Sequence, residues 1–217
     1  MKDPLQMKVH TISISATMGA LLLSGIASAD LQGISIDSFD SGFGIGLTHR
    51  VYVDVDTGDQ VNAIFGDTES ALDIHPETGS FYQNMFGYSS PPDEALFFLF
   101  PSLAYDSFVT IGLLTNTDNA MLDIGIDWAD FETNGGAIWA DNGTWFATPD
   151  DAQVYEQDGR VLIGQFTGAM PEGYVNILGK NADNSSWEYS HIPLGIPAPG
   201  AIAVLGLAGL LCVRRRK

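Results

Sequence analysis

Hydrophobic and polar residues alternate through much of the chain between residues 30 and 195. The alternation is strictest in Arg50–Asp56, where three valines occupy every second position. A period of two residues is typical of a β-strand that buries one face. The turn sequence Thr57-Gly58-Asp59 and the apolar run Val61–Phe65 follow directly, so we expect the two segments to pair as a hairpin.

Further segments have the composition of strands and are separated by clusters of Gly, Asn, Asp and Pro. They are Ile34–Ile36, Gly42–Leu47, Phe81–Gly87, Leu96–Phe100, Phe108–Leu114, Ile124–Trp128, Val161–Thr167, Tyr174–Lys180 and Trp187–His191. No stretch of this region carries a period of 3.6 residues long enough for a sizeable helix. The pattern predicts an all-β single domain, an antiparallel β-sandwich of jelly-roll type, with long loops at Ser89–Pro92 and Asp141–Gly159.

The beginning of the chain has the organisation of an export signal. Lysines near the start precede the mainly apolar run Ile12–Ile26, and Ala27 and Ala29 flank a serine before Asp30. A positive start, an apolar stretch and a small-x-small site together form a secretory signal peptide. We therefore expect signal peptidase to recognise Ala27 and Ala29 and to remove residues 1–29 as a signal helix. The alternative is that the run stays in place as an N-terminal membrane helix.

The end of the chain, residues 196–217, carries a second apolar segment with three parts in a fixed order. A proline motif, Pro197-Ala198-Pro199, precedes the apolar span Gly200–Val213, which is followed by four cations, Arg214, Arg215, Arg216 and Lys217. As a helix this 14-residue span would measure about 21 Å, against roughly 30 Å for a bilayer core. The cations should stay on the cytoplasmic side, which leaves the rest of the protein outside. One interpretation is a plain C-terminal membrane anchor.

This tail resembles the PEP-CTERM sorting tag of exported bacterial proteins. In that family a proline motif, a Gly/Ala/Leu-rich span and an arginine cluster occur in the same order. The family's usual Pro-Glu-Pro is Pro197-Ala198-Pro199 here. The resemblance implies that a membrane-embedded exosortase recognises the tag and removes it near the prolines. Four internal segments resemble a group of tag-bearing secreted proteins with no known activity: Thr115–Asn119, Gly125–Trp128, Trp145–Asp150 and Arg160–Thr167.

Between the terminal segments lies one predicted domain, residues 30–195, with a strongly acidic charge. It holds three basic residues against 26 acidic ones, a formal net charge of −23 with histidine neutral. Such a charge repels nucleic acid and anionic lipid, so the sequence predicts neither as a partner. The only cysteine, Cys212, lies in the tail. We therefore expect a domain that is held together by core packing without disulfides.

Clustered carboxylates make calcium the cofactor that the sequence favours. Asp54, Asp56 and Asp59 lead through a turn, and Asp118 stands in an Asn/Thr-rich turn further along. Carboxylate oxygens are the ligands that Ca²⁺ takes, although the spacing is not that of an EF-hand. The competing interpretation is that these aspartates are solvated turn residues.

Other chemistry has weaker signals. Trp139, Trp145 and Trp187 are candidates to stack on sugars. A glycoside hydrolase needs two facing carboxylates, and the sequence does not single out two among 26 acids. The chain contains neither the His-Glu-x-x-His zinc motif nor the Gly-x-Ser-x-Gly nucleophile motif. Arg160 opens an apolar strand, and we expect it to pair with an aspartate such as Asp127.

The sequence therefore predicts an exported, acidic β-sandwich of the cell surface or extracellular matrix, without enzymatic activity. Its expected partners are signal peptidase, an exosortase-like enzyme, the membrane at its C-terminal segment and extracellular polysaccharide. Two alternatives remain open. A carbohydrate-binding module should present an exposed row of aromatic rings, and a jelly-roll glycoside hydrolase should present two carboxylates that converge in one cleft.

Overall fold

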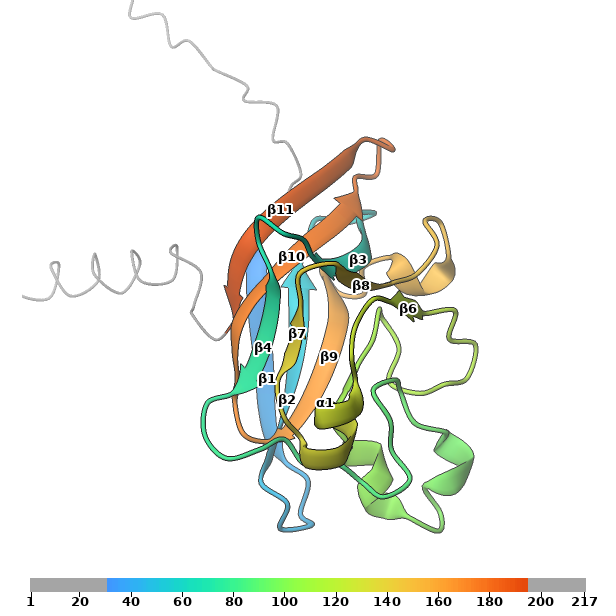
Figure 1. Ribbon diagram of the computed structural model, residues 1–217. Coiled ribbons are helices and arrows are strands. Elements are labelled where there is room, and N and C mark those ends of the chain that lie inside the picture. Colours follow the sequence, from blue (N-terminus) through green and yellow to red (C-terminus); the bar gives the residue numbers. More distant parts are fainter. Residues whose placement is uncertain (1–30, 195–217) are drawn as a thin grey trace, which may run out of the picture.

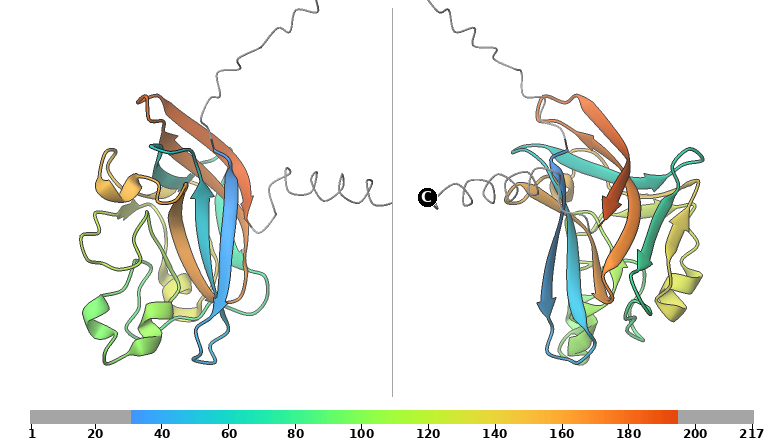
Figure 2. Two further views of the ribbon diagram at one scale, coloured as in Figure 1. Left: turned by 180° about the vertical axis from the view of Figure 1, so that it is seen from behind. Right: turned by 90° about the vertical axis from the view of Figure 1, so that its left-hand side faces the viewer.

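The computed structural model describes residues 31–194, which form two antiparallel β-sheets packed face to face (Figure 1). The views in Figure 2 show the sheets as separate layers, with β1 and β2 in one and β4, β7 and β10 in the other. The all-β class predicted from alternation is confirmed. The predicted signal peptide, with Ala27 and Ala29, and the predicted sorting tag lie outside the described residues.

The smaller sheet has four strands and contains the segment of strict alternation. Its strand order is β1 (Gly33–Asp40), β2 (Leu47–Asp54), β9 (Arg160–Gly168) and β5 (Phe108–Val109). All pairs in it are antiparallel, and β2 lies between β1 and β9 along its whole length.

The larger sheet has seven strands arranged around the long central strand β10 (Pro171–Lys180). One edge of β10 pairs with β3 (Gln60–Gly66) over Asn176–Lys180 and with β4 (Leu72–Pro76) over Pro171–Tyr174. The other edge pairs with β11 (Ser186–Leu194). The sheet continues outward through β8 (Gly143–Phe146) and β6 (Leu122–Ile124) on β3, and through β7 (Ile138–Ala140) on β4.

Short helices lie within the connections between the strands. They are η1 (Glu94–Leu96), η2 (Pro101–Tyr105), η3 (Ala152–Val154) and α1 (Ala129–Asn134). α1 is capped by Gly135, whose φ of 66° is a left-handed conformation that glycine adopts readily. Between residues 31 and 194, no helix has the length and apolarity that crossing a membrane requires.

The core lies where the apolar faces of the two sheets meet. Val51, Val53 and Val55 are buried as the alternation predicts, and Tyr52 between them is partly exposed. The larger sheet meets these valines with Val61, Ile64, Leu72, Ile74, Val175 and Ile177. Trp145 is the largest fully buried side chain within residues 31–194, and its indole N–H donates to the Thr110 carbonyl at 3.1 Å. The polar atom of this ring is therefore satisfied inside the core.

The predicted hairpin between Arg50–Asp56 and Val61–Phe65 is wrong. The turn exists, with the Asp59 N–H donating to the Asp56 carbonyl at 3.1 Å. However, β2 pairs with β1 and β9, whereas β3 pairs with β10 and β8. The turn therefore carries the chain from one sheet to the other, because both edges of β2 are already occupied.

Some predicted strands are confirmed and others are not. Ile34–Ile36, Val161–Thr167, Tyr174–Lys180 and Trp187–His191 lie within β1, β9, β10 and β11. Gly42–Leu47 is instead mostly the loop between β1 and β2, and its three glycines have φ values of 79°, 71° and 94°. L-residues rarely adopt this conformation, which explains why glycines recur there.

The remaining differences lie in the middle of the chain. Phe81–Gly87 is a loop, and Leu96–Phe100 makes helical turns around η1. Only the first two residues of Phe108–Leu114 form a strand, and Ile124–Trp128 is a strand only at Ile124. The short strands β4, β7 and β8 were not predicted, and β8 falls inside the expected loop Asp141–Gly159.

Candidate functional site

The outer face of the larger sheet carries a row of exposed aromatic and acidic side chains. β7 buries Ile138 and Ala140 and therefore turns Trp139 outward, with 56% of this residue exposed. In the same way β4 turns Asp73 outward, and β10 turns Tyr174 outward at 40% exposure. Asp73 is directly opposite Trp139 on one side and Tyr174 on the other.

Strand spacing fixes the width of this row. Neighbouring strands lie about 4.8 Å apart, so Trp139 and Tyr174, two strands apart, are separated by about 10 Å at the backbone. The Asp73 carboxylate stands between the two rings because its strand lies between theirs. We call Trp139, Asp73, Tyr174 and His191 the outer-face row.

His191 extends the row by stacking on Tyr174. The two ring centroids are 3.9 Å apart and the ring planes differ by 11°. His191 comes from β11, on the opposite edge of β10 from Asp73. We therefore expect the Tyr174 face that His191 leaves open to lie on the Asp73 side.

A β-bulge sets the position of His191. The register between β10 and β11 shifts between Val175 and Ile177, and His191 has a positive φ of 59°. Its backbone N–H donates to Asn176 Oδ1 at 2.8 Å. The buried Asn176 also accepts from Ser70 Oγ at 2.8 Å and donates to the Ser70 carbonyl at 2.6 Å. One buried amide therefore fixes both the bulge and the loop between β3 and β4.

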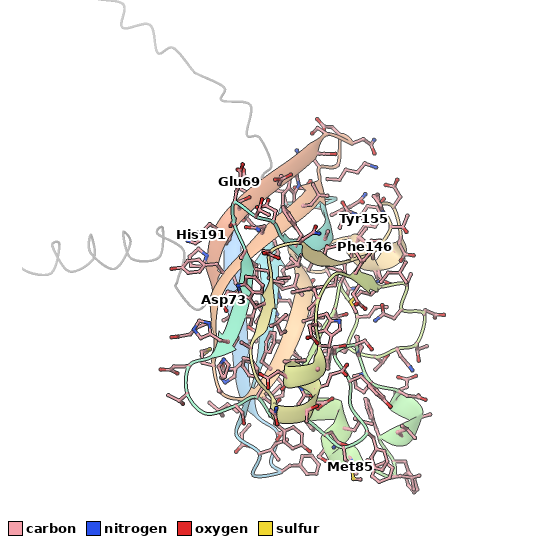
Figure 3. All side chains as sticks on the ribbon, viewed as in Figure 1. Glu69, Asp73, Met85, Phe146, Tyr155 and His191 are labelled. Atoms are coloured by element: carbon pink, nitrogen blue, oxygen red, sulfur yellow. The ribbon has the colours of Figure 1, made fainter. Side chains whose placement is uncertain are left out.

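Polar groups continue from the row along the face. His75 Nδ1 lies 3.2 Å from Asp73 Oδ1, and Glu172 is directly opposite His75. A hollow of about 290 Å³ is lined by His75, Glu172, Tyr174 and Pro193, among others. Figure 3 shows Asp73 and His191 on the same side of the domain, with Glu69 above them. The face therefore combines flat rings with hydrogen-bonding groups.

A second part of the outer face is more apolar. Leu122, Phe146, Ala63 and Leu178 follow one another across β6, β8, β3 and β10 in register. Phe146, Ala63 and Leu178 border a hollow of about 380 Å³, which Asn62 and Glu188 also line. Figure 3 shows Phe146 on the other side of the view from Asp73 and His191.

Of the three tryptophans expected to stack on sugars, one is on the surface. Trp145 and Trp187 are buried, with 0% and 6% exposure, and belong to the core. Trp139 is exposed and lies in the outer-face row. Sequence reasoning did not select Tyr174, Asp73 or His191, although alternation within Tyr174–Lys180 could have marked Tyr174 as outward-facing.

The four aspartates proposed as calcium ligands occupy different surroundings. Asp54 accepts a hydrogen bond from Ser35 at 2.7 Å, and Asp56 accepts one from Gln32. Asp118 lies in a separate turn between β5 and β6, with a φ of 56°. Within residues 31–194, no three His, Cys, Asp or Glu side chains are grouped so that they could hold a metal ion. Calcium binding therefore stays a prediction.

Asp59 is the unusual member of this set because it is buried. Its Oδ1 accepts from the Ala182 N–H at 2.9 Å, while its buried Oδ2 has no hydrogen-bond partner among the described residues. Burial raises the pKa of Asp59, and the nearby charges of Asp56 and Asp183 add to the rise. The turn thus holds a carboxyl group that is costly to ionise.

The basic side chains of the domain form ion pairs and hydrogen bonds within the fold. Arg160 pairs with Asp37, at 2.8 Å between Nη2 and Oδ2, and lies 3.9 Å above the centre of the Tyr52 ring. The expected pairing with Asp127 is wrong, because Asp127 instead accepts from the Ala129 N–H at the start of α1. The actual partner is on β1, two strands from Arg160 across β2.

The other two basic residues are similarly engaged. Arg50 donates to Gln165 at 3.0 Å, and Lys180 pairs with Asp150 at 2.9 Å. Hydrogen bonds from Gln60 and Lys180 lower the pKa of Asp150. None of these contacts involves the outer-face row.

The sequence did not predict that Asp106 is a buried acid. Its Oδ1 accepts from the Asn84 N–H at 2.6 Å, whereas Oδ2 has no hydrogen-bond partner among the described residues. Burial raises the pKa of Asp106 to about 7, and the charge of Glu132 contributes to the rise. Because Asp106 is fully buried, this acidic pair does not form an open cleft for a substrate.

Comparison with known proteins adds no relative: no family model, curated protein or solved structure matches the chain.

Proposed function

We propose that this protein is an exported component of the cell surface or extracellular matrix that acts by binding rather than by catalysis. In this proposal, residues 1–29 are a signal helix that signal peptidase removes. Residues 196–217 are a sorting tag whose helical span Gly200–Val213 holds the protein in the membrane until an exosortase-like enzyme cleaves near the prolines.

The observation that carries the proposal is the agreement between the two terminal segments and the folded domain. Among the described residues, the first strand starts at Gly33 and the last ends at Leu194. These strands lie between Ala29 and Ile196, so both expected cleavages would spare every strand of residues 31–194. A formal charge of −23 over residues 30–195 is consistent with a protein exposed to water and repelled by anionic lipid headgroups.

Sequencing and mass spectrometry of the cell-surface and released forms test this proposal. The mature chain should begin at Asp30, and the released protein should lack Gly200–Lys217. Deletion of the exosortase should leave the full tail in the membrane fraction. A released chain that retains Arg214–Lys217 would favour the plain membrane anchor, and a mature chain that retains residues 1–29 would overturn export by a cleaved signal.

The terminal cations allow a matched control. Replacing Arg214–Lys217 with neutral residues removes the charges that should hold the span in place, so the protein should be mis-sorted. Replacing Arg160 with methionine also removes a cation but leaves the tail intact, and sorting should then be unchanged.

A second function, carbohydrate binding, is favoured by the outer-face row. The alternative stated from the sequence requires exposed aromatic rings in a row, and Trp139 and Tyr174 are exposed rings on either side of Asp73. A domain that binds polysaccharide would also suit a protein of the extracellular matrix.

A further inference from the structure

We propose that the outer-face row binds a strand of a neutral polysaccharide, laid across β7, β4 and β10. The inference deepens the proposed function and depends on it only for the place of action, because export would bring this face into contact with extracellular polymers. The binding itself is a property of Trp139, Asp73, Tyr174 and His191.

Ring geometry is the first argument. A sugar ring presents a flat C–H face, which packs on the face of an aromatic side chain, and hydroxyl groups at its edge. Trp139 and Tyr174 are half-exposed aromatic rings about 10 Å apart at the backbone, a separation on the scale of a disaccharide. Two consecutive sugars could therefore contact the two rings while the strand passes over Asp73.

The polar groups between and beside the rings are the second argument. The Asp73 carboxylate can accept hydrogen bonds from sugar hydroxyls, and hydrogen bonds to an ionised acceptor are the stronger ones. His75 and Glu172 offer further polar atoms around the adjoining hollow. A purely apolar ligand would leave these groups desolvated without partners, which is unfavourable.

Three side chains of the row, Asp73, Tyr174 and His191, also have fixed contacts before a ligand arrives. Tyr174 is stacked on His191, and the His191 backbone is fixed through the buried Asn176. Asp73 contacts His75 at 3.2 Å. Side chains that are already ordered lose less conformational entropy on binding, which favours affinity.

Charge decides which class of polysaccharide fits. The domain carries −23, and Asp73 and Glu172 are both on this face, so an acidic polymer would be repelled. The three cations of the domain do not counter this, because Arg50, Arg160 and Lys180 contact Gln165, Asp37 and Asp150 elsewhere. A neutral polymer is bound without this repulsion.

Retardation in native affinity gels tests the proposal with the purified full chain in mild detergent. The probes are neutral glucans, mannan and xylan, with alginate as the acidic polymer. At least one neutral polymer should retard the protein. Trp139→Ala or Tyr174→Ala should raise the Kd for that polymer about tenfold or more. Asp73→Asn should weaken it less, because the amide still accepts one hydrogen bond.

Phe98→Ala is the matched control, since Phe98 is 91% exposed and lies in the connection between β4 and β5, outside this face. Its retardation should equal that of the unchanged protein. Urea unfolding followed by tryptophan fluorescence should show that all variants remain folded. Binding should also change little between low and high NaCl, because charge attraction does not drive it.

Three results would overturn the inference: no retardation by any neutral polymer, equal retardation of the Trp139, Tyr174 and Phe98 variants, or preferential binding of alginate. None of them bears on export, which is measured on processed chains in cells. Conversely, a failed export test would leave binding by the purified protein unaffected.

Discussion

The buried carboxyl of Asp106 should make the stability of the domain depend on pH in a direction opposite to that of a salt-bridged acid. Its pKa is raised from 3.8 to about 7 because burial disfavours the ionised form. One pKa unit corresponds to about 1.4 kcal/mol, so ionising Asp106 in the folded state costs about 4 kcal/mol. A domain is typically stable by only about 5–15 kcal/mol, so this cost is a large share.

The sign follows from the proton count in the two states. Below pH 3.8 the carboxyl is protonated whether the chain is folded or unfolded, and no cost arises. Between pH 3.8 and about 7 the unfolded chain ionises while the folded chain keeps the proton, so stability falls as pH rises. Above about 7 both states are ionised and the full cost remains.

Asp106→Asn isolates this effect from the other acids. The asparagine carbonyl can still accept from the Asn84 N–H, but the side chain no longer titrates. We expect the unfolding free energy of the variant, minus that of the unchanged protein, to rise by about 4 kcal/mol between pH 4 and pH 8. Any constant cost of the new amide shifts both ends equally and leaves this rise intact.

Urea unfolding at several pH values, followed by tryptophan fluorescence, measures the difference. Asp118→Asn is the control, because Asp118 is exposed and asparagine tolerates its positive φ of 56°. This variant removes an exposed carboxyl rather than a buried one, so it controls for the loss of one acidic side chain. A change below about 1 kcal/mol for Asp106→Asn would refute the reasoning, because the carboxyl would then ionise at little cost in the fold.

Two further predictions concern charge. Arg160→Met removes the ion pair with Asp37 and the cation–π contact with Tyr52. Because the guanidinium is partly exposed, the unfolding free energy should fall by only about 1 kcal/mol. An unchanged urea midpoint would contradict this. Millimolar Ca²⁺ should raise the melting temperature more than NaCl of matched ionic strength, and Asp54→Asn with Asp56→Asn should remove the excess. Equal shifts in the two salts would mean that the carboxylates serve solubility alone.

The strand in Arg50–Asp56 was predicted from alternation because its two faces meet different surroundings. Val51, Val53 and Val55 face the core while Tyr52 is partly exposed, so the period of two is visible in the sequence. The segment Leu96–Phe100 has the composition of a buried strand and yet forms helical turns, with Leu99 65% exposed. Backbone hydrogen bonds donated from residue i+3 to residue i, and Pro101 directly after the segment, outweigh its apolar composition there.

Pairing was the part that local patterns could not determine. The turn predicted after Asp56 is present in the structure, but a turn does not specify whether the next strand joins the same sheet. That outcome depends on β9, far along the chain, which occupies the edge of β2 that β3 would have needed. Hydrogen bonds between distant segments therefore decided the topology.

The candidate site shows the same limit at the level of single residues. Residue type alone does not distinguish the three tryptophans Trp139, Trp145 and Trp187. The alternation of each strand places two of them in the core and one on the surface. An outward position is still not a site. Trp139 is opposite Asp73 because β7 pairs with β4 in this register. Asp73 is opposite Tyr174 because β4 pairs with β10. A shift of one residue in either pairing would turn these side chains away from each other, so the row is a property of the register rather than of any segment taken alone.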